Sequence, residues 1–542
     1  MGLLALPMTA QASVTPDGAL HAYARARLAD GDGSSPLAVA NYRLALDSDA
    51  SSTVARRSYL RALESGDFPL VLRSAALLDR DGLLPRDGTL LYIADALNRK
   101  DWAAARTWTG RMADEGNFAF LAPLVESWIS LGEGNYAPPI IVAKDRFGAL
   151  ARRYLDEQTA LQALARQNVE AALPAIRATI ATRAGDQDAL RLTFAVQLAR
   201  QGAKEQALDL LPEGHANFAA ARADILRGRG KTLRRAGAPL TPAQGFGRLL
   251  ARLAVDADAM EGGGRLAVRL ARIATFADPG PESRVVAARL LIENDNPALA
   301  IAEARKVPPE GYHGALAQAE LVDALDEAGQ GDAAIALARS MTQAPDAEAE
   351  RFVRLGRLLA ADRDFDGAAE AFRAAQARYP ADAVPWTLLL FEGSALEQGK
   401  RWDEARAVLE RAAVIAPNEP VILNYLGYAQ VERRQNVDEA LELLKKASTL
   451  KPDDPSITDS LGWATFIAGN VEAAVPVLEK AAAGAPADVT IHEHLGDALW
   501  AAGRRYEARY AWRAAAAFAD GKVAERLEAK TREGMKPEYA AP

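Results

Sequence analysis

Five glycines in the second half of the chain recur at nearly constant intervals, and this regularity constrains the architecture more than any other feature. They lie 37, 34, 35 and 34 residues apart, at Gly356, Gly393, Gly427, Gly462 and Gly496. An alanine keeps step with each glycine, and a proline follows four of them; these are Ala368, Ala405, Ala440, Ala474, Ala508, Pro380, Pro417, Pro452 and Pro486. A fixed period of this length indicates a small structural unit repeated along the chain, because each unit can bury its apolar face only against its neighbours.

The unit over residues 349–382 shows what the small residues do. Its spaced positions are Phe352, Leu355, Gly356, Leu359, Ala368, Phe372, Ala375 and Pro380. This pattern resembles the tetratricopeptide repeat, W-x2-L-G-x2-Y…A-x3-F-x2-A…P, which is a pair of antiparallel helices. We expect Gly356 to face Ala368 where the two helices cross, since larger side chains would push them beyond about 8–10 Å. Pro380 is expected to end the second helix because proline has no backbone N–H.

The resemblance implies an all-α fold, a right-handed α-solenoid of antiparallel helix pairs that is regular in the C-terminal half and degenerate in the N-terminal half. Strand signals are almost absent, and the Thr241-Pro242 pair predicts a helix start inside the least repetitive region. The expected organisation is 1–12, a remnant of a signal peptide; 13–144, degenerate helical hairpins; 145–280, helical and weakly repetitive; 281–348, divergent units; 349–520, five regular units; and 521–542, a capping helix and tail.

Composition excludes some classes of function. Lys and Arg total 64 against 72 Asp and Glu, a net charge of −8, whereas a nucleic-acid binder would be expected to carry a basic footprint. The chain has no cysteine, which excludes disulfides, thiolate zinc sites and cysteine nucleophiles. No run approaches the ~20 apolar residues of a membrane span.

No motif in the chain predicts catalysis, a metal or a cofactor. Gly230-Lys231-Thr232 resembles the end of a phosphate-binding loop, but Ile225 stands where that loop requires glycine. His492 and His494 are two residues apart, so on a helix they point in different directions, unlike the i, i+4 histidines of zinc helices. We therefore predict no enzyme activity.

The inner groove of the solenoid is the better candidate site. In the tetratricopeptide family, positions 2, 5, 9 and 12 of the first helix line the concave surface. Mapped onto this sequence, they bring four aromatic and three acidic residues together: Tyr428, Asp459, Trp463, Phe466, Glu493, Asp497 and Trp500. Aromatic anchors with polar rims are typical of binding hot spots, which predicts a protein-binding groove. The alternative is that these rings pack against neighbouring helices.

The runs Asp459-Ser460-Leu461-Gly462-Trp463 and Glu493-His494-Leu495-Gly496-Asp497 add detail to this resemblance. They are similar to the C-terminal units of exported bacterial tetratricopeptide proteins, among them the outer-membrane adaptor of a carboxyl-terminal processing protease. That resemblance implies a non-catalytic scaffold or adaptor of the cell envelope, whose partners are proteins or peptides, an envelope protease among them. Two alternatives remain open: a structural component of a polysaccharide-export or envelope-assembly complex, and an enzyme whose site lies within 145–275.

The beginning of the chain predicts export. Leu3-Leu4-Ala5-Leu6 is a short apolar run, and Ala10-Gln11-Ala12 has the small-residue spacing of a signal-peptide cleavage site. A basic region before the apolar run is missing, which is explained if the true start lies upstream. We expect a periplasmic or secreted protein; the alternative is a cytoplasmic one.

Overall fold

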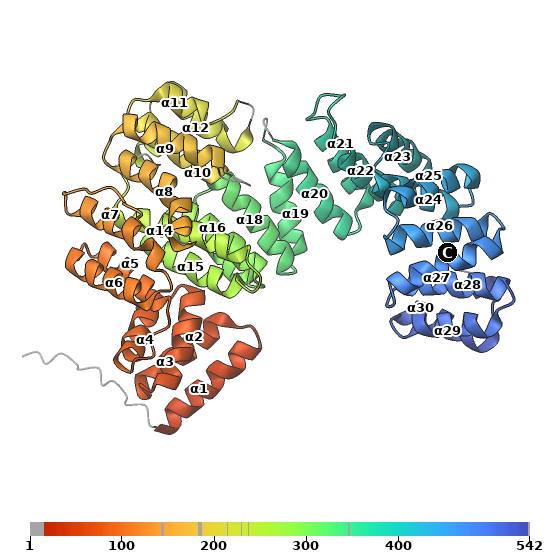
Figure 1. Ribbon diagram of the computed structural model, residues 1–542, viewed down its shortest axis with the longest axis horizontal. Coiled ribbons are helices and arrows are strands. Elements are labelled where there is room, and N and C mark those ends of the chain that lie inside the picture. Colours follow the sequence, from red (N-terminus) through yellow and green to blue (C-terminus); the bar gives the residue numbers. More distant parts are fainter. Residues whose placement is uncertain are drawn as a thin grey trace, which may run out of the picture. The chain divides into compact units, whose positions relative to one another are not determined.

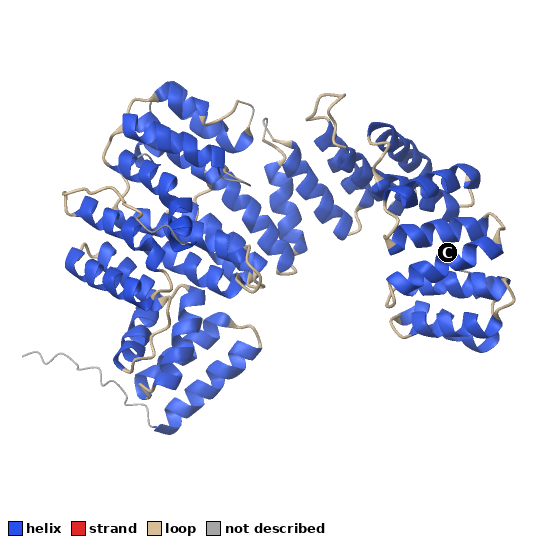
Figure 2. Ribbon diagram, viewed as in Figure 1, coloured by secondary structure: helices blue, strands red, loops and turns tan. Residues whose placement is uncertain are grey.

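The computed structural model describes residues 16–142, 146–182, 187–213, 215–228, 230–236, 238–344 and 347–539. These residues form α-helices and two short 3-10 helices, with no strand among them (Figures 1 and 2). The predicted all-α, tetratricopeptide-type α-solenoid is confirmed. No helix in these ranges combines the length and the apolar character needed to cross a bilayer. The expected signal-peptide remnant, 1–12, lies outside the described residues.

The chain divides into two units, Met1–Ala347 and Glu348–Pro542. The helices of the first unit are α1 (Pro16–Gly31), α2 (Ser35–Ser48), α3 (Ser52–Ser65), α4 (Phe68–Arg80), α5 (Gly88–Asn98), α6 (Trp102–Glu115), η1 (Ala119–Leu121), α7 (Ala122–Gly132), α8 (Arg146–Ala165), α9 (Val169–Thr182), α10 (Asp188–Arg200), α11 (Lys204–Asp209), α12 (Ala216–Arg227), α13 (Lys231–Ala236), α14 (Pro242–Asp258), α15 (Gly264–Ala277), α16 (Pro281–Glu293), α17 (Pro297–Ala304), α18 (Gly314–Glu327) and α19 (Gly331–Met341).

The helices of the second unit alternate in direction and form consecutive pairs. They are α20 (Ala349–Ala361), α21 (Phe365–Gln376), α22 (Trp386–Gln398), α23 (Trp402–Ile415), α24 (Pro420–Glu432), α25 (Val437–Leu450), α26 (Pro455–Ile467), α27 (Val471–Gly484), α28 (Val489–Ala501), α29 (Arg505–Ala516), α30 (Gly521–Glu533) and η2 (Pro537–Tyr539).

Local sequence signals explain where the helices of the second unit begin. The Asp454 side chain accepts hydrogen bonds from the backbone N–H groups of Ser456 and Ile457, and Asp488 accepts one from Ile491. Such caps satisfy donors that have no partner within the helix. In the last two pairs the turn between the helices contains a glycine with positive φ, Gly469 at +85° and Gly503 at +79°, a conformation that costs glycine little. These residues mark the starts of α26 and α28 and the turns that follow them.

The glycine at the crossing of each pair lies against a large side chain of the second helix. A side-chain atom added at Gly356 would meet the Phe372 ring at 2.7 Å, so Phe372 covers the glycine. The residue four positions after the repeated alanine has the same role in the other pairs: Leu409 covers Gly393, Leu444 covers Gly427, Leu478 covers Gly462 and Trp512 covers Gly496. The alanine lies one turn earlier on the second helix, and the larger side chain fills the space that the glycine leaves.

In the first unit, some helices pack against helices that are distant in the sequence as well as against their neighbours in the chain. The predicted start of α14 is confirmed, because Thr241 and Gln244 form a reciprocal capping box with proline at the first helical position. Helices α14 and α15 then pack against the much earlier helices α3, α5 and α7. Phe68 stacks on Phe276 with ring centroids 4.6 Å apart. The first unit therefore has a core to which α14 and α15 contribute together with much earlier helices, although α8–α13 lie between them in the chain.

Candidate functional site

The first helices of four successive pairs, α22, α24, α26 and α28, form one surface of the second unit, which we call the first-helix face. Helix α24 contacts α26, and α26 contacts α28, so side chains from different repeats meet there. Two hollows of about 400 Å³ each lie on this face, one lined mainly by acidic and hydroxyl groups and one by apolar and aromatic groups.

The acidic hollow gathers oxygen atoms from all four first helices and from the residue that caps α28. Its lining residues are Glu397, Asn424, Tyr425, Tyr428, Ala429, Glu432, Ser456, Asp459, Ser460, Asp488, Thr490 and Ile491. The Tyr425 hydroxyl donates to Glu397 Oε2 at 2.7 Å. Burial raises the pKa of the Tyr428 hydroxyl, and the carboxylates of Glu432 and Asp459 raise it further.

A buried histidine contacts Asp459, one of the residues that line this hollow. His494 is 2% exposed, and its Nδ1 lies 2.9 Å from Asp459 Oδ2. The His494 ring stacks on the Trp463 indole, with centroids 4.0 Å apart and planes 9° apart. His492, in contrast, lies 3.2 Å from the carbonyl oxygen of Pro486. The two histidines therefore have separate partners, and among the described residues no group of three or more His, Cys, Asp or Glu side chains is placed to hold a metal.

The aromatic hollow adjoins the acidic one through Glu432. Its lining residues are Val431, Glu432, Arg434, Trp463, Phe466, Ile467, Asp497, Met535, Lys536 and Pro537. The Phe466 ring stacks on the Trp463 indole at 5.1 Å. The chain that follows α30 forms one wall, because it turns at Gly534, where φ is +88°, and packs on the Trp500 ring.

Two of the predicted groove carboxylates, Glu493 and Asp497, form ion pairs with the capping helix. Lys530 of α30 is fully buried, and its Nζ lies 2.7 Å from Glu493 Oε1 and 2.8 Å from both oxygens of Asp497. Arg526 adds a two-pronged contact to Glu493 at 3.0 and 2.7 Å. Burial alone would raise the pKa of Glu493, but the hydrogen bonds from Arg526 and Lys530 outweigh it and lower the pKa below its usual value. Burial dominates at Asp497 and raises its pKa.

The seven predicted site residues therefore divide into three groups. Tyr428 and Asp459 line the acidic hollow; Trp463, Phe466 and Asp497 line the aromatic hollow; Glu493 and Trp500 line neither. Trp463 is 5% exposed and Asp497 is 3% exposed, so both act mainly in packing. Sequence reasoning missed the hollow-lining residues Tyr425, Glu432, Asp488, Met535 and Lys536. Glu432 is the last residue of α24 and Asp488 caps the start of α28, and the four concave positions of the repeat include neither of these places.

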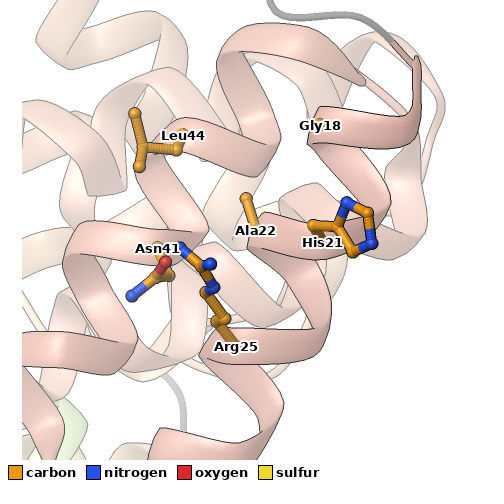
Figure 3. Close-up of a pocket in the computed structure, with 6 residues that line it drawn as sticks. All are labelled: Gly18, His21, Ala22, Arg25, Asn41 and Leu44. Atoms are coloured by element: carbon orange, nitrogen blue, oxygen red, sulfur yellow. The ribbon is translucent and has the colours of Figure 1, made fainter.

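A third hollow, of about 330 Å³, lies between α1 and α2 in the first unit. Figure 3 shows Arg25 reaching from α1 toward Asn41 of α2, with His21 and Gly18 on the same helix as Arg25. Asn41 already donates to the Leu37 carbonyl oxygen at 2.8 Å. The described residues that line this hollow include no carboxylate or hydroxyl group, so they offer less varied chemistry than the first-helix face.

The region proposed for a hidden enzyme site contains a buried polar cluster. Arg248 of α14 pairs with Glu282 and, at 3.4 Å, with Asp278. Thr193 of α10 donates to Glu282 at 2.6 Å. Burial raises the pKa of Asp278. These groups meet where α10, α14 and α16 pack together, and the Nε–H of Arg248 has no hydrogen-bond acceptor within the described part of the chain.

No protein-family model matches the chain, and no curated protein matches it in sequence. Among solved structures, MamA AMB-1 has 23% identity and a TM-score of 0.27, over 30% of this chain and 95% of that one. MamA 41-end from Desulfovibrio magneticus RS-1 has 16% identity and a TM-score of 0.28, over 31% and 94%. The APC/C hetero-tetramer Cut9-Hcn1 has 14% identity and a TM-score of 0.37, over 95% and 96%. The assignment as a tetratricopeptide-type solenoid depends on the repeated residues and helix pairs of the chain itself.

Proposed function

We propose that this protein is a non-catalytic scaffold or adaptor of the bacterial cell envelope that holds a partner protein or peptide on the first-helix face of its second unit. The observation that carries the proposal is the pair of adjoining hollows, one aromatic and one acidic, formed by side chains from successive repeats. Apolar anchors beside charged groups are the usual composition of a protein-binding hot spot. The location in the envelope is supported by the cleavage-site spacing at Ala10-Gln11-Ala12 and by the resemblance to exported adaptors. An envelope protease is the partner that this resemblance favours.

The structure changes the choice of variant for a binding test. Trp463 is buried between Phe466 and His494, so its removal would open a cavity, with a cost of about 3–5 kcal/mol. Phe466 lines the same hollow but is only half-buried. We expect Phe466→Ser to remove most of the partner captured from an envelope extract, measured by affinity purification with quantitative mass spectrometry.

The matched control for this experiment is Tyr510→Ser, which removes an aromatic ring that is 68% exposed on α29 and lines neither hollow. Circular dichroism should show the same helix content in both variants and in the unmodified protein. A partner retained equally by Phe466→Ser and Tyr510→Ser would contradict binding at the aromatic hollow.

Export makes a separate prediction about the mature protein. If Ala10-Gln11-Ala12 is a cleavage site, the protein in the periplasmic or secreted fraction should begin at Ser13. Intact-mass measurement after cell fractionation would show this directly. Recovery of the chain only from the cytoplasm, with residues 1–12 still attached, would contradict export and favour the cytoplasmic alternative.

A further inference from the structure

We propose that the acidic hollow receives the side chain of a lysine or arginine from the partner, an inference that rests on the proposed function and specifies the chemistry of that partner. Four carboxylates, those of Glu397, Glu432, Asp459 and Asp488, surround the hollow. None of the residues that the structure places around it is a lysine or an arginine. Complementary charge at such a surface would select a basic segment and disfavour an acidic one.

Two acceptors at the hollow have no donor within the described part of the chain. Asp459 is 4% exposed, and its Oδ1 is shielded from solvent without a hydrogen bond, although its Oδ2 contacts His494. The side-chain oxygen of Asn424, on the neighbouring helix α24, is likewise shielded from solvent and has no hydrogen bond within the described residues. A shielded acceptor without a donor costs about 1–3 kcal/mol. A donor brought by a ligand would recover that cost, and an ammonium or guanidinium group has donors only.

The cations near the hollow are fewer than its carboxylates. Arg433 contacts Glu397 at 2.7 Å and also acts on Glu432, which accepts a hydrogen bond from the Tyr428 hydroxyl. Arg434 and Lys536 line the adjoining aromatic hollow. Partial burial of the Glu432 carboxylate raises its pKa, and repulsion from Glu397 raises it further. Excess negative charge of this kind favours the entry of a cation.

The surroundings fit an organic cation better than a metal ion. The described residues include no cluster of three or more metal-ligating side chains arranged around one point. The rings of Tyr425 and Tyr428 do line the hollow, and aromatic faces attract ammonium and guanidinium groups. Carboxylates, shielded acceptors and aromatic rings together form a receptor for a basic side chain.

The test uses the full chain and a defined probe, a fluorescently labelled peptide of four Lys-Ser repeats with both ends blocked. Fluorescence anisotropy at low ionic strength would give its affinity, and the same peptide with glutamate in place of lysine tests the sign of the charge. We expect Glu432→Gln to weaken binding of the lysine peptide about two- to fivefold, the usual effect of one lost charge pair. Asp459→Asn should weaken it as well, and added salt should reduce binding by the unmodified protein.

The control variant is Glu439→Gln, which removes the same charge from an exposed position on α25 that does not line the hollow. It should change the affinity less than twofold. Equal effects of Glu432→Gln and Glu439→Gln, equal binding of the glutamate peptide, or no binding of the lysine peptide would each overturn the inference.

The two proposals fail in distinguishable ways. Phe466→Ser tests partner capture at the aromatic hollow, and Glu432→Gln tests the cation site, which shares with it only Glu432 among the lining residues. If Phe466→Ser loses the partner while the lysine peptide never binds, the protein remains a scaffold and only the basic-segment inference is wrong. If the lysine peptide binds as expected but no partner depends on Phe466, the proposed use of the aromatic hollow is wrong instead.

Discussion

Replacing Lys530 with methionine is expected to destabilise the end of the second unit by about 3–5 kcal/mol, the usual cost of removing one partner from a buried ion pair. Lys530 has no exposed surface and is the shared donor to Glu493 and Asp497. Its loss would leave Asp497 with only the Trp512 N–H, 2.8 Å away. Hydrogen exchange of peptides from α28 and α30 would measure the effect where it occurs, since repeat proteins open locally.

The matched control is Lys522→Met, on the same helix but exposed. That substitution should change the exchange of α28 by less than about 0.5 kcal/mol, as is usual for surface positions. Similar protection of α28 in both variants would show that α30 does not hold the last repeat through this contact.

The loss of folding stability caused by Lys530→Met should also depend on pH. The linkage between proton binding and folding determines the direction of this dependence. In the folded protein, burial already raises the pKa of Asp497, and loss of the ammonium group would raise it further. Between the unfolded value of an aspartate, about 3.9, and this raised folded value, the folded state binds more protons than the unfolded state. Stability therefore falls as pH rises through that window. The deficit should be largest at neutral pH and smallest near pH 4, which hydrogen exchange or urea unfolding at several pH values would measure.

The sequence predicted the periodic part of this fold well, because small residues at fixed intervals have a local physical cause. The glycine at each crossing and the side-chain caps that begin α21, α24, α26, α27 and α28 depend on residues within one repeat. The repeat pattern did not identify the side chain that covers each glycine, which is Phe372 at Gly356 and lies one helical turn beyond the repeated alanine. Periodicity identifies which face of a helix is buried but not every side chain of the neighbouring helix that it meets.

The candidate site was harder to predict because lateral neighbours decide it. Positions 2, 5, 9 and 12 of α28 include Glu493, Asp497 and Trp500, which the repeat pattern assigns to an open groove. The capping helix brings Lys530 to the first two, and the turn after it places Gly534 on Trp500. Residues in the last repeat thus have partners that an internal repeat lacks. Even within the internal repeats, the sequence did not reveal that Asp459 would share its carboxylate with His494 from the next unit.

The long-range packing of the first unit had no sequence signal at all. Thr241 and Pro242 marked the start of α14, but nothing in the sequence indicated that this helix would pack on α5 and α7. Asn98 donates to the Phe276 carbonyl oxygen at 3.0 Å across 178 positions of the chain. Contacts of this separation depend on the complementary shape of surfaces, which a single sequence does not display.

One such contact gives the second large effect: Gly245→Ala should destabilise the first unit by about 1–3 kcal/mol or more, although alanine is the better helix former. A methyl group at Gly245 would lie 2.2 Å from two carbon atoms of the Trp128 indole. That ring cannot easily withdraw, because it is fully buried and its Nε1 donates to Gln158 at 2.8 Å. Hydrogen exchange of α7 and α14 should show lower protection.

Gly110→Ala separates this steric effect from helix propensity. Gly110 lies inside α6, is exposed, and has no atom within 4 Å of the added methyl group, so the same substitution should stabilise by up to about 1 kcal/mol. If alanine destabilises the protein at Gly245 but stabilises it at Gly110, the absence of a side chain at Gly245 is what makes room for the Trp128 ring. The double variant Gly245→Ala with Trp128→Phe should then cost less than the sum of the two single variants, because a smaller ring makes room for the methyl group. Strict additivity would mean that the methyl group and the indole do not meet, and that α14 does not pack on α7 through this contact.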